Sequence, residues 1–326
     1  ALVASTSVPT PNGWVPIDNL KIGDLVFDQR GQPTEVTLVQ EYTPQECYEV
    51  EFEDGLTLAG DKRLTLHMQD RKWRNRVDES QRRVTKRRGK MTRPLIVKTM
   101  EELHTLPLLD HRGWKVYSVP NCLPVQYGHR DLPVPPYVFG IWFGSVTGLG
   151  RLWLRDKPLN KMQRIFRNCG YFIKTKKHKN GLTMFDIRPS VRDSFLFAGL
   201  DIPQSLPFYY LDGDVGQRRD LLEGLIDSGF IKKYKNSNLH CATNGNYHLL
   251  RKIQALVESL GIKTTLFTPT HTPSYTLKFR IKYDLSVLYG TNRRFVTKIT
   301  KISPKPCVHI ETNGQFLVGE GFIPAC

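Results

Sequence analysis

The sequence lacks the features that mark disulfide-rich, zinc-binding and membrane proteins. Its six cysteines in 326 residues include no Cys-x-x-Cys pair, so neither a zinc site nor a disulfide framework is indicated. The longest charge-free stretch, 132–150, holds three prolines and four glycines, which interrupt a membrane helix. No basic region followed by an apolar run opens the chain, as a secretory leader would require. We therefore expect a soluble, cytoplasmic protein without a membrane partner.

Acidic residues are scarce relative to basic ones. Lys and Arg number 47 against 31 Asp and Glu, which gives a formal net charge of +16 and favours a polyanionic partner. The length allows two ordinary domains, or one domain inserted into another. The chain begins with Ala rather than Met and ends in Ile-Pro-Ala-Cys, as expected of a segment of a longer polypeptide.

Both end regions carry strand patterns. In the first, Tyr48, Val50 and Phe52 alternate with glutamates, the period of a half-buried strand, and Asp54-Gly55 follows as a turn. Further strand patterns occur at 25–27, 36–39, 296–302, 308–310 and 316–318. We expect the two ends to form one β unit, either a twisted sheet or a small barrel.

The middle of the chain carries helix patterns. Apolar residues recur at helical spacing from 249 to 260 and stop at Gly261, and a weaker copy runs from 162 to Gly170. A glycine-bearing apolar helix is predicted before each copy, at 137–144 and 221–228. This repetition predicts a pseudo-twofold α/β domain.

A strongly basic segment lies at 71–98, with twelve Lys or Arg and two acids. Such a run is either a solvated, partly disordered loop or an arm that follows a phosphate backbone. Charge alone leaves both interpretations open.

The two glycine-bearing segments, Tyr-Val-Phe-Gly-Ile-Trp-Phe-Gly-Ser-Val-Thr-Gly at 137–148 and Leu-Leu-Glu-Gly-Leu-Ile-Asp-Ser-Gly-Phe at 221–230, resemble the paired helices of LAGLIDADG homing endonucleases. The resemblance implies an acid at the foot of each helix that holds Mg²⁺ over the scissile phosphate, because hard cations take carboxylate ligands. Ser145 and Gly229 stand at those positions here. Asp227 remains, but in that family it is not the metal ligand. We therefore expect the fold without productive metal binding or cleavage.

The ends resemble the conserved blocks of inteins. Residues 1–13 and 15–26 are similar to the first block, and 307–310 and 315–323 are similar to the two closing blocks, so that the resemblance covers essentially the whole chain. It implies an all-β Hint splicing domain, built from both ends and interrupted by a pseudo-twofold LAGLIDADG domain of mixed α/β structure. The expected domains are 1–122 (with the basic arm 71–98), a linker at 123–129, the endonuclease domain at 130–296, and 297–326, which includes the first downstream residue.

Splicing in that family needs a nucleophile at position 1, a second nucleophile just after the intein, and a terminal Asn that cyclises. Ala1 and Ala325 supply neither side chain, whereas Cys326, read as the first downstream residue, could accept an acyl group. Pro324 stands where the family has a penultimate His. Either the chain begins with a natural Ala and the downstream Cys attacks directly, or alanines were introduced to trap the precursor. The two alanines favour the trap, and autocatalysis is expected to be blocked.

The family's internal histidine, which protonates the scissile nitrogen, has three possible registers in this sequence. Alignment on Ala-Gly selects Asp61, spacing from Gly55 selects Leu64, and a three-residue slip selects His67. His309 stands where many inteins have an Asp that activates the first step. Cys307 stands where one class has a branching Cys, but it is favoured as a buried structural thiol because Gln69 replaces the Trp of that class.

The function implied is an intein of the bacterial or phage type, expected as a monomer, whose partners are its flanking extein sequences and duplex DNA. Splicing needs no cofactor. The basic residues expected to contact DNA are Arg71, Lys72, Arg82, Arg83, Lys86, Arg87, Arg88, Lys90, Lys232 and Lys233. The alternative is a stand-alone sequence-specific DNA-binding protein or LAGLIDADG endonuclease without splicing activity. The two differ in one respect: only an intein must hold both ends of the chain together.

Overall fold

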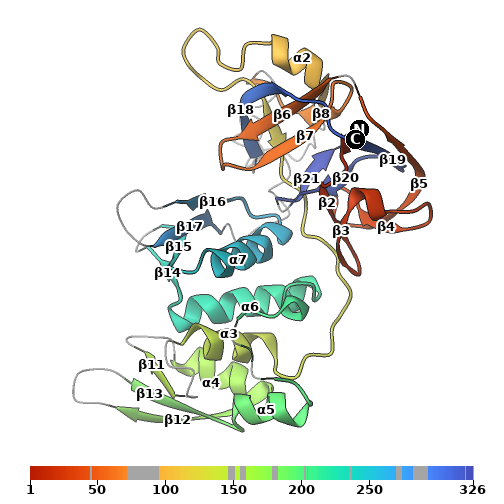
Figure 1. Cartoon of the computed structure of the whole chain (residues 1–326). Coiled ribbons are helices and arrows are strands. Elements are labelled where there is room, and N and C mark those ends of the chain that lie inside the picture. The colour runs from red at the N-terminus through yellow and green to blue at the C-terminus, as the bar shows by residue number, and fades with distance from the viewer. Residues whose placement is uncertain are drawn as a thin grey trace, which may run out of the picture. The chain divides into compact units, whose positions relative to one another are not determined.

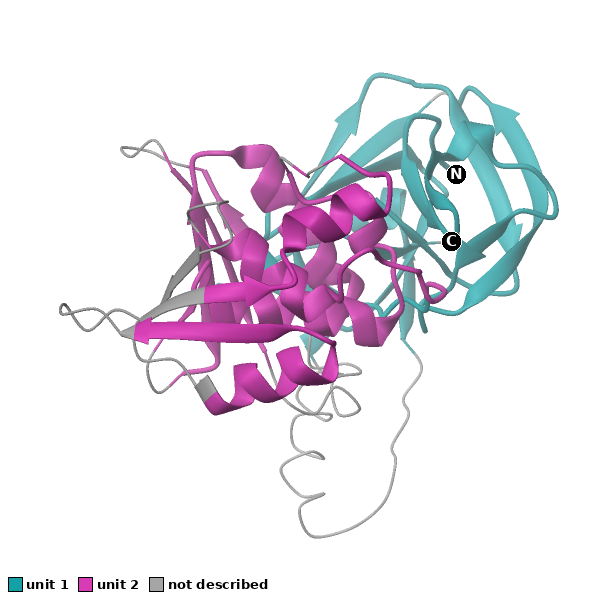
Figure 2. Cartoon of the chain, turned by 90° about the horizontal axis from the view of Figure 1, so that it is seen from below, with its two compact units in different colours: residues 1–126, 261–265, 282–326 teal, residues 127–260, 266–281 magenta. Residues whose placement is uncertain are grey.

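The computed structural model describes residues 1–44, 46–71, 95–145, 151–154, 159–177, 183–201, 203, 205–234, 237–268, 274–281, 293–319 and 321–325. The chain forms two compact units, drawn in two colours in Figure 2. Unit 1 contains residues 1–126, 261–265 and 282–326, and unit 2 contains 127–260 and 266–281. Within the described residues, no helix is long and apolar enough to span a membrane.

Unit 1 is built around an eight-stranded sheet in which strands from both ends of the chain interleave. The order is β10-β18-β6-β7-β1-β19-β5-β4. The bounds are β1 (Leu2–Val3), β4 (Leu25–Phe27), β5 (Pro33–Tyr42), β6 (Cys47–Phe52), β7 (Thr57–Asp61), β10 (Ser118–Pro120), β18 (Arg293–Ile302) and β19 (Cys307–Thr312). The strand predictions for both ends are confirmed, and in β6 Val50 and Phe52 are buried while Glu49 and Glu51 are not.

The described part of unit 1 also contains three two-stranded sheets. They are β2 (Ser7–Thr10) with β3 (Gly13–Pro16), β8 (Thr65–Met68) with β9 (Ile96–Thr99), and β20 (Phe316–Val318) with β21 (Ile323–Ala325). Two short helices lie among them, η1 (Ile17–Asn19) and α2 (Met100–Thr105). Helix α2 begins at a capping box, because the Thr99 hydroxyl accepts from the Glu102 backbone and the Glu102 carboxylate accepts from the Thr99 backbone.

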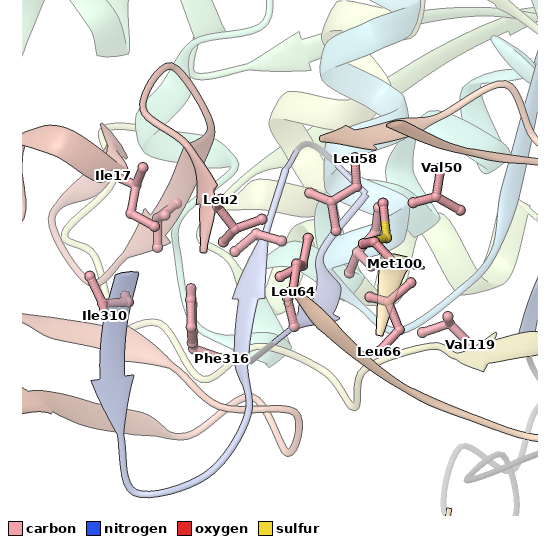
Figure 3. Close-up of a cluster of buried hydrophobic side chains, with 14 of the residues drawn as sticks. Leu2, Ile17, Val50, Leu58, Leu64, Leu66, Met100, Val119, Ile310 and Phe316 are labelled. Atoms are coloured by element: carbon pink, nitrogen blue, oxygen red, sulfur yellow. The ribbon is translucent and has the colours of Figure 1, made fainter. Parts of the chain in front are cut away.

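The core of unit 1 mixes side chains from both ends of the sequence. Leu2, Leu58, Leu64, Ile310 and Phe316 are all buried in one cluster, shown in Figure 3. Each fully buried Leu, Ile or Phe contributes about 1.5–3 kcal/mol relative to an exposed one. Separation of the two ends of the chain would therefore expose this shared core to water.

The domain limits differ from the expected ones at two places. The expected boundary at 297 falls inside β18, which begins at Arg293. The expected linker at 123–129 begins inside unit 1, since the backbone N–H of Leu123 donates to Gln29 and that of Gln126 donates to Gly31.

Unit 2 contains five helices in its described part, with two sheets. The helices are α3 (Pro136–Gly144), α4 (Leu159–Asn168), α5 (Val191–Phe197), α6 (Val215–Ser228) and α7 (Tyr247–Ser259), with a short η2 (Phe208–Tyr210). One sheet is β11 (Arg151–Leu154), β13 (Thr183–Arg188) and β12 (Phe172–Lys177); the other is β14 (Ile231–Lys233), β15 (Leu239–Asn244), β17 (Tyr275–Arg280) and β16 (Thr264–Phe267). Figure 1 shows a sheet at each end of this unit with the helices between them.

The predicted helices are confirmed, and α3 and α6 pack at their glycines. A Cβ on Gly140 would lie 2.6 Å from the Leu221 carbonyl oxygen, and a Cβ on Gly224 would overlap the Tyr137 carbonyl oxygen. Gly140 thus faces the carbonyl of Leu221, three residues before Gly224. In the same way, Gly224 faces the carbonyl of Tyr137, three residues before Gly140. The two helices contact each other symmetrically, which matches the repetition in the sequence.

Candidate functional site

The first residue is held inside the large sheet. Strand β1 lies between β7 and β19, with Leu2 opposite both Gly60 and Val308. The backbone N–H of Asp61 donates to the Ala1 carbonyl oxygen at 3.0 Å. A Cβ on Gly60 would overlap that same oxygen, so only glycine permits this approach.

The side chain of Asp61 binds the backbone nitrogen of Ala1. Its Oδ1 accepts a hydrogen bond from the Ala1 nitrogen at 2.6 Å. Its Oδ2 accepts from the Tyr42 hydroxyl at 2.5 Å and from Arg63 Nε at 3.3 Å, and Arg63 Nη2 also donates to the Tyr42 hydroxyl at 3.1 Å. Asp61 therefore contacts Ala1 through both its backbone and its carboxylate.

The carboxylate of Asp61 is buried but ionised. Burial by itself would raise its pKa, but the hydrogen bonds from the Ala1 nitrogen and Tyr42 outweigh burial, so that the pKa lies below its ordinary value. Burial raises the pKa of Tyr42, and its hydrogen bond to Asp61 raises it further. At neutral pH the site therefore contains a carboxylate beside a neutral phenol.

Two thiols lie next to Ala1. Ala1, Val3, Cys47 and Cys307 form one buried cluster, with the sulfur atoms of Cys47 and Cys307 4.0 Å apart. Burial, together with the neighbouring Cys47, raises the pKa of Cys307 to about 12. Cys307 is thus a protonated, buried thiol at neutral pH, and such thiols are poor nucleophiles.

The other end of the chain enters the same core. Ala325 is fully buried on β21, opposite Phe316 on β20, and belongs to the same hydrophobic cluster as Leu2. Figures 1 and 2 mark the two ends of the chain next to each other in views turned by 90°. Phe322 has φ +50°, a left-handed backbone conformation that is unusual for an aromatic residue. Cys326 lies outside the described residues.

The three residues that could take the place of the internal histidine lie in different surroundings. Asp61 contacts the Ala1 nitrogen, whereas Leu64 is an apolar side chain in the core. His67 is half-buried on β8, opposite Val97, and burial lowers its pKa so that it is neutral at pH 7. The residue that the structure brings to the Ala1 nitrogen is therefore Asp61.

His309 lies on β19, opposite Gln40, with its Nε2 3.4 Å from Glu311 on the same strand. The contacts described for it, within the part of the chain that the structure covers, do not include Ala1 or Asp61.

The two predicted acid positions of the paired helices serve as helix ends. Ser145 caps α3, where its hydroxyl donates to the Trp142 carbonyl oxygen at 2.7 Å. Gly229 ends α6 with φ +89°. The nearby Asp227 accepts hydrogen bonds from the Tyr137 hydroxyl at 2.8 Å and from Lys161 at 3.1 Å.

Lys161 also pairs with Glu223, and these two carboxylates raise its pKa although burial opposes this. A single lysine therefore pairs with two carboxylates of α6, Glu223 and Asp227. No cluster of three or more potential metal ligands occurs in the ranges that the structure describes. Because no carboxylate stands at Ser145 or Gly229, the residues present do not fit a Mg²⁺ site.

The predicted DNA-contacting residues are only partly described. Arg71 forms an ion pair with Asp110 and lies over the Trp114 ring, and its contact with DNA stays a prediction. Lys232 and Lys233 are exposed on β14. The residues of the 71–98 segment from Ile96 to Lys98 form β9 and belong to the fold of unit 1 rather than to an arm. The remaining positions, Lys72, Arg82, Arg83, Lys86, Arg87, Arg88 and Lys90, lie outside the described residues.

Sequence reasoning missed Tyr42, Arg63 and Lys161. Tyr42 ends a long strand and lies 19 residues from its partner Asp61, so no local pattern connects the two. Arg63 follows Asp61 by two residues, and a charged pair at that spacing could have drawn attention to it.

Comparison with known proteins finds similarity to a replicative helicase. The DnaB replicative DNA helicase of Mycobacterium intracellulare is 24% identical to this chain over 350 residues, which cover 99% of the chain and 58% of the helicase. The DnaB helicase of Mycobacterium leprae is 36% identical over 62 residues, covering 19% of the chain and 10% of the helicase. The chain therefore spans less than two thirds of the length of either helicase. No protein-family model matches the chain.

Solved structures of inteins are similar to a smaller part of the chain. The MchDnaB-1 intein is 33% identical, with a TM-score of 0.20, over 21% of this chain and 53% of that intein. The splicing domain of the Msm DnaB1 intein, solved with zinc, is 31% identical, with a TM-score of 0.21, over 21% of this chain and 55% of its own length. The gp41-1 intein is 30% identical, with a TM-score of 0.20, over 21% of this chain and 53% of its own length.

Proposed function

We propose that the chain is an intein, whose β unit brings two peptide junctions together for acyl exchange. The observation that carries the proposal is the burial of both Ala1 and Ala325 in one β unit, with both backbone polar atoms of Ala1 held by Asp61. The intein-like blocks at the two ends of the sequence support it. A stand-alone DNA-binding protein has no need to hold its two ends in one core.

The chemistry follows from the position of Asp61. In a precursor the nitrogen of residue 1 is the amide nitrogen of the scissile bond, and it would donate its hydrogen to Asp61 Oδ1 as the Ala1 nitrogen does here. A thiol that attacks the preceding carbonyl carbon expels this nitrogen as an amine, which then takes up a proton. The carboxylate favours that protonated product because it stabilises a positive charge more than a neutral amide.

The residues at the junctions limit which steps can occur. Ala1 has no heteroatom, so it cannot attack the carbonyl that precedes it, and Ala325 has no side-chain amide with which to cyclise. Cys307 is buried and protonated, which leaves Cys326 as the nucleophile at the downstream junction. We propose that this sequence is blocked before ligation, with Ala1 and Ala325 in place of the reactive residues.

The test places the chain between two reporter domains, with four versions compared: unchanged, Ala1→Cys, Ala325→Asn, and both together. Ligated reporters are expected from the double variant alone, and mass spectrometry measures them. A double variant that yields neither ligated nor cleaved product would refute the splicing function. Ligation by the unchanged chain would instead show that its alanines do not block the reaction.

We further propose that unit 2 is a degenerate LAGLIDADG domain that binds duplex DNA without cutting it. The symmetric packing of α3 and α6 at Gly140 and Gly224 supports the fold, and the net charge of +16 supports a polyanionic partner. The loss of carboxylates at Ser145 and Gly229, with Lys161 paired to Asp227, supports the loss of cleavage.

DNA binding has its own test. Titration of a labelled duplex at several salt concentrations is expected to give an affinity that falls with salt, and Lys232→Gln with Lys233→Gln should reduce the slope by up to about two units. Lys21→Gln in unit 1 is the control. Affinity that does not depend on salt would contradict the proposal, as would Mg²⁺-dependent cleavage of a duplex in which the coding sequence lacks this insertion.

The similarity to DnaB helicases extends over nearly the whole chain, and it supports a replicative DNA helicase as the flanking extein protein. On this proposal the chain functions as a monomer in the cytoplasm of a bacterium or a phage-infected cell. Sequencing of the DNA on both sides of the coding region tests it, because helicase sequence is expected on each side.

A further inference from the structure

We propose that Tyr42 and Arg63 are positioning residues that fix the Asp61 carboxylate against the nitrogen of residue 1, and thereby promote the first acyl transfer. This inference rests on the proposed splicing function. It adds two residues that neither the intein-like blocks nor the predicted sites include.

The geometry supports the inference, because the two oxygens of Asp61 have separate tasks. Oδ2 accepts from the Tyr42 hydroxyl at 2.5 Å and from Arg63 Nε at 3.3 Å, which leaves Oδ1 for the Ala1 nitrogen at 2.6 Å. The donation from Arg63 Nη2 to the Tyr42 hydroxyl closes the cluster. A carboxylate held at both oxygens cannot rotate away from the junction.

The cluster draws its parts from different elements. Tyr42 ends β5, Asp61 ends β7, and Arg63 lies in the turn after β7, where the Leu64 N–H donates to the Asp61 carbonyl oxygen. Ala1 precedes β1, which lies between β7 and β19 in the sheet order. The folded sheet therefore aligns the carboxylate and its donors before any reaction begins, and such preorganisation is a main source of electrostatic catalysis.

The proposed step balances as follows. The attacking thiol loses its proton and forms a bond from sulfur to the acyl carbon, while the bond from that carbon to the nitrogen of residue 1 breaks. The thiol proton goes to the nitrogen, which leaves as an amine, and a second proton from water makes it an ammonium. The charge beside Asp61 thus exists only after the bond has broken, so the carboxylate stabilises the product side more than the intact junction.

Few other titratable groups face Asp61. Among the described residues they are the Ala1 nitrogen, Tyr42, Arg63, the Cys307 thiol and Cys47, which lies opposite Asp61 on β6. Burial raises the pKa of Tyr42, and burial with the neighbouring Cys47 raises that of Cys307 to about 12, so both are neutral in an assay between pH 2 and 8. Asp61 is therefore the group of this cluster that titrates on the acid side of such an assay.

The experiment uses the full chain with Ala1→Cys behind an N-terminal reporter, and measures the release of that reporter by dithiothreitol from pH 2 to 8, a range that includes the lowered pKa of Asp61. In this background Tyr42→Phe is expected to slow release about tenfold at pH 7 and to move the acid limb of the pH profile to higher pH, because Asp61 loses a donor. Asp61→Asn is expected to slow release about a hundredfold and to leave only the acid limb of dithiothreitol itself, whose thiolate fraction falls as the pH falls.

Arg63→Gln should act in the same direction as Tyr42→Phe but less strongly, because the Arg63 side chain is 72% exposed and its charge is screened. Arg63→Lys should restore the Ala1→Cys profile in part. Tyr48→Phe is the matched control, because Tyr48 lies in the same unit and its ring packs at a tilt against that of His104, with the centroids 5.3 Å apart. It should leave the profile unchanged.

The outcomes separate this inference from the splicing function. If the Ala1→Cys chain releases its reporter and Tyr42→Phe changes neither rate nor profile, the positioning role is wrong while the splicing function stands. If the Ala1→Cys chain releases nothing, both fail. A carboxyl ¹³C titration of the unchanged chain and of Tyr42→Phe gives a reading independent of splicing, because the positioning role requires the Asp61 pKa to rise in the variant.

Discussion

Gly60 and Asp61 are neighbours in sequence with different tasks at the first junction. Gly60 leaves room for the Ala1 carbonyl oxygen, and Asp61 binds both the carbonyl oxygen and the nitrogen of that residue. One residue acts by having no side chain and the other by having a short charged one. At the residue scale, the site therefore depends on two adjacent positions with opposite side-chain requirements.

Gly60→Ala is expected to destabilise the protein by about 1–3 kcal/mol, because its methyl group would overlap the Ala1 carbonyl oxygen and push β1 away from β7. Urea unfolding measures the change. Gly128→Ala, which meets no atom within 4 Å, is the control and should change stability by less than about 0.5 kcal/mol. Equal stability of the two variants would contradict the close approach at Gly60.

Asp61→Asn is expected to lower stability at pH 7 by about 1–3 kcal/mol, the cost of weakening a buried, charged hydrogen bond. Because the folded pKa of Asp61 is lowered, its contribution is present above the unfolded value of about 4 and is lost as the pH falls through the folded pKa. The unfolding midpoints of the two proteins should therefore converge as the pH falls through the lowered folded pKa of Asp61. A difference that persists or grows in acid would mean that Asp61 is not held ionised.

The contact between the helices α3 and α6 depends on residues that have no side chain. Both have a glycine at the crossing point, and each glycine faces a backbone carbonyl of the other helix. Glycine is a poor helix former, costing about 1 kcal/mol relative to alanine, so its presence in both helices reflects close packing rather than propensity.

Gly140→Ala and Gly224→Ala should therefore each destabilise unit 2 by about 1–3 kcal/mol, although alanine favours a helix in isolation. The two costs should be similar because the contact is symmetric. Circular dichroism during thermal unfolding measures them, with Gly128→Ala again as the control. An increase in Tm for either variant would show that the helices do not approach this closely.

On the scale of the whole molecule, the two ends of the chain share one core. Leu2 is buried together with Leu58, Ile310, Phe316 and Ala325, which come from opposite ends of the sequence. Neither end alone therefore supplies the whole of this core. This arrangement suits an element that has to act on the two peptide bonds at its own boundaries.

Leu2→Ala is expected to cost about 2–5 kcal/mol, because it leaves a cavity where strands from both ends meet. Leu25→Ala is the control: Leu25 is 47% exposed on β4, and its truncation should have a small effect. Urea unfolding followed by tryptophan fluorescence measures both. Similar costs for the two would contradict a core shared by the chain ends.

Much of the fold follows from local patterns. The alternation in β6, the helical spacing that ends at Gly261 and the paired glycine helices are all read within a few residues, because strand and helix periods are local properties of the chain. The candidates Ala1, Asp61 and Ala325 were also found in the sequence. The sequence could not decide which of Asp61, Leu64 and His67 takes the place of the family's internal histidine, because each of the three is selected by a different alignment.

The tertiary structure decided which of these residues meet. Asp61 lies 60 positions from Ala1 and 19 from Tyr42, and only the pairing of β7 with β1 and the end of β5 bring the three together. Likewise, Lys161 reaches Asp227 from another helix. The sequence by itself determined the elements and the residue types at the two ends, since these depend on short-range periodicity. The partners of each charged group depend on long-range strand and helix packing, which no local pattern encodes.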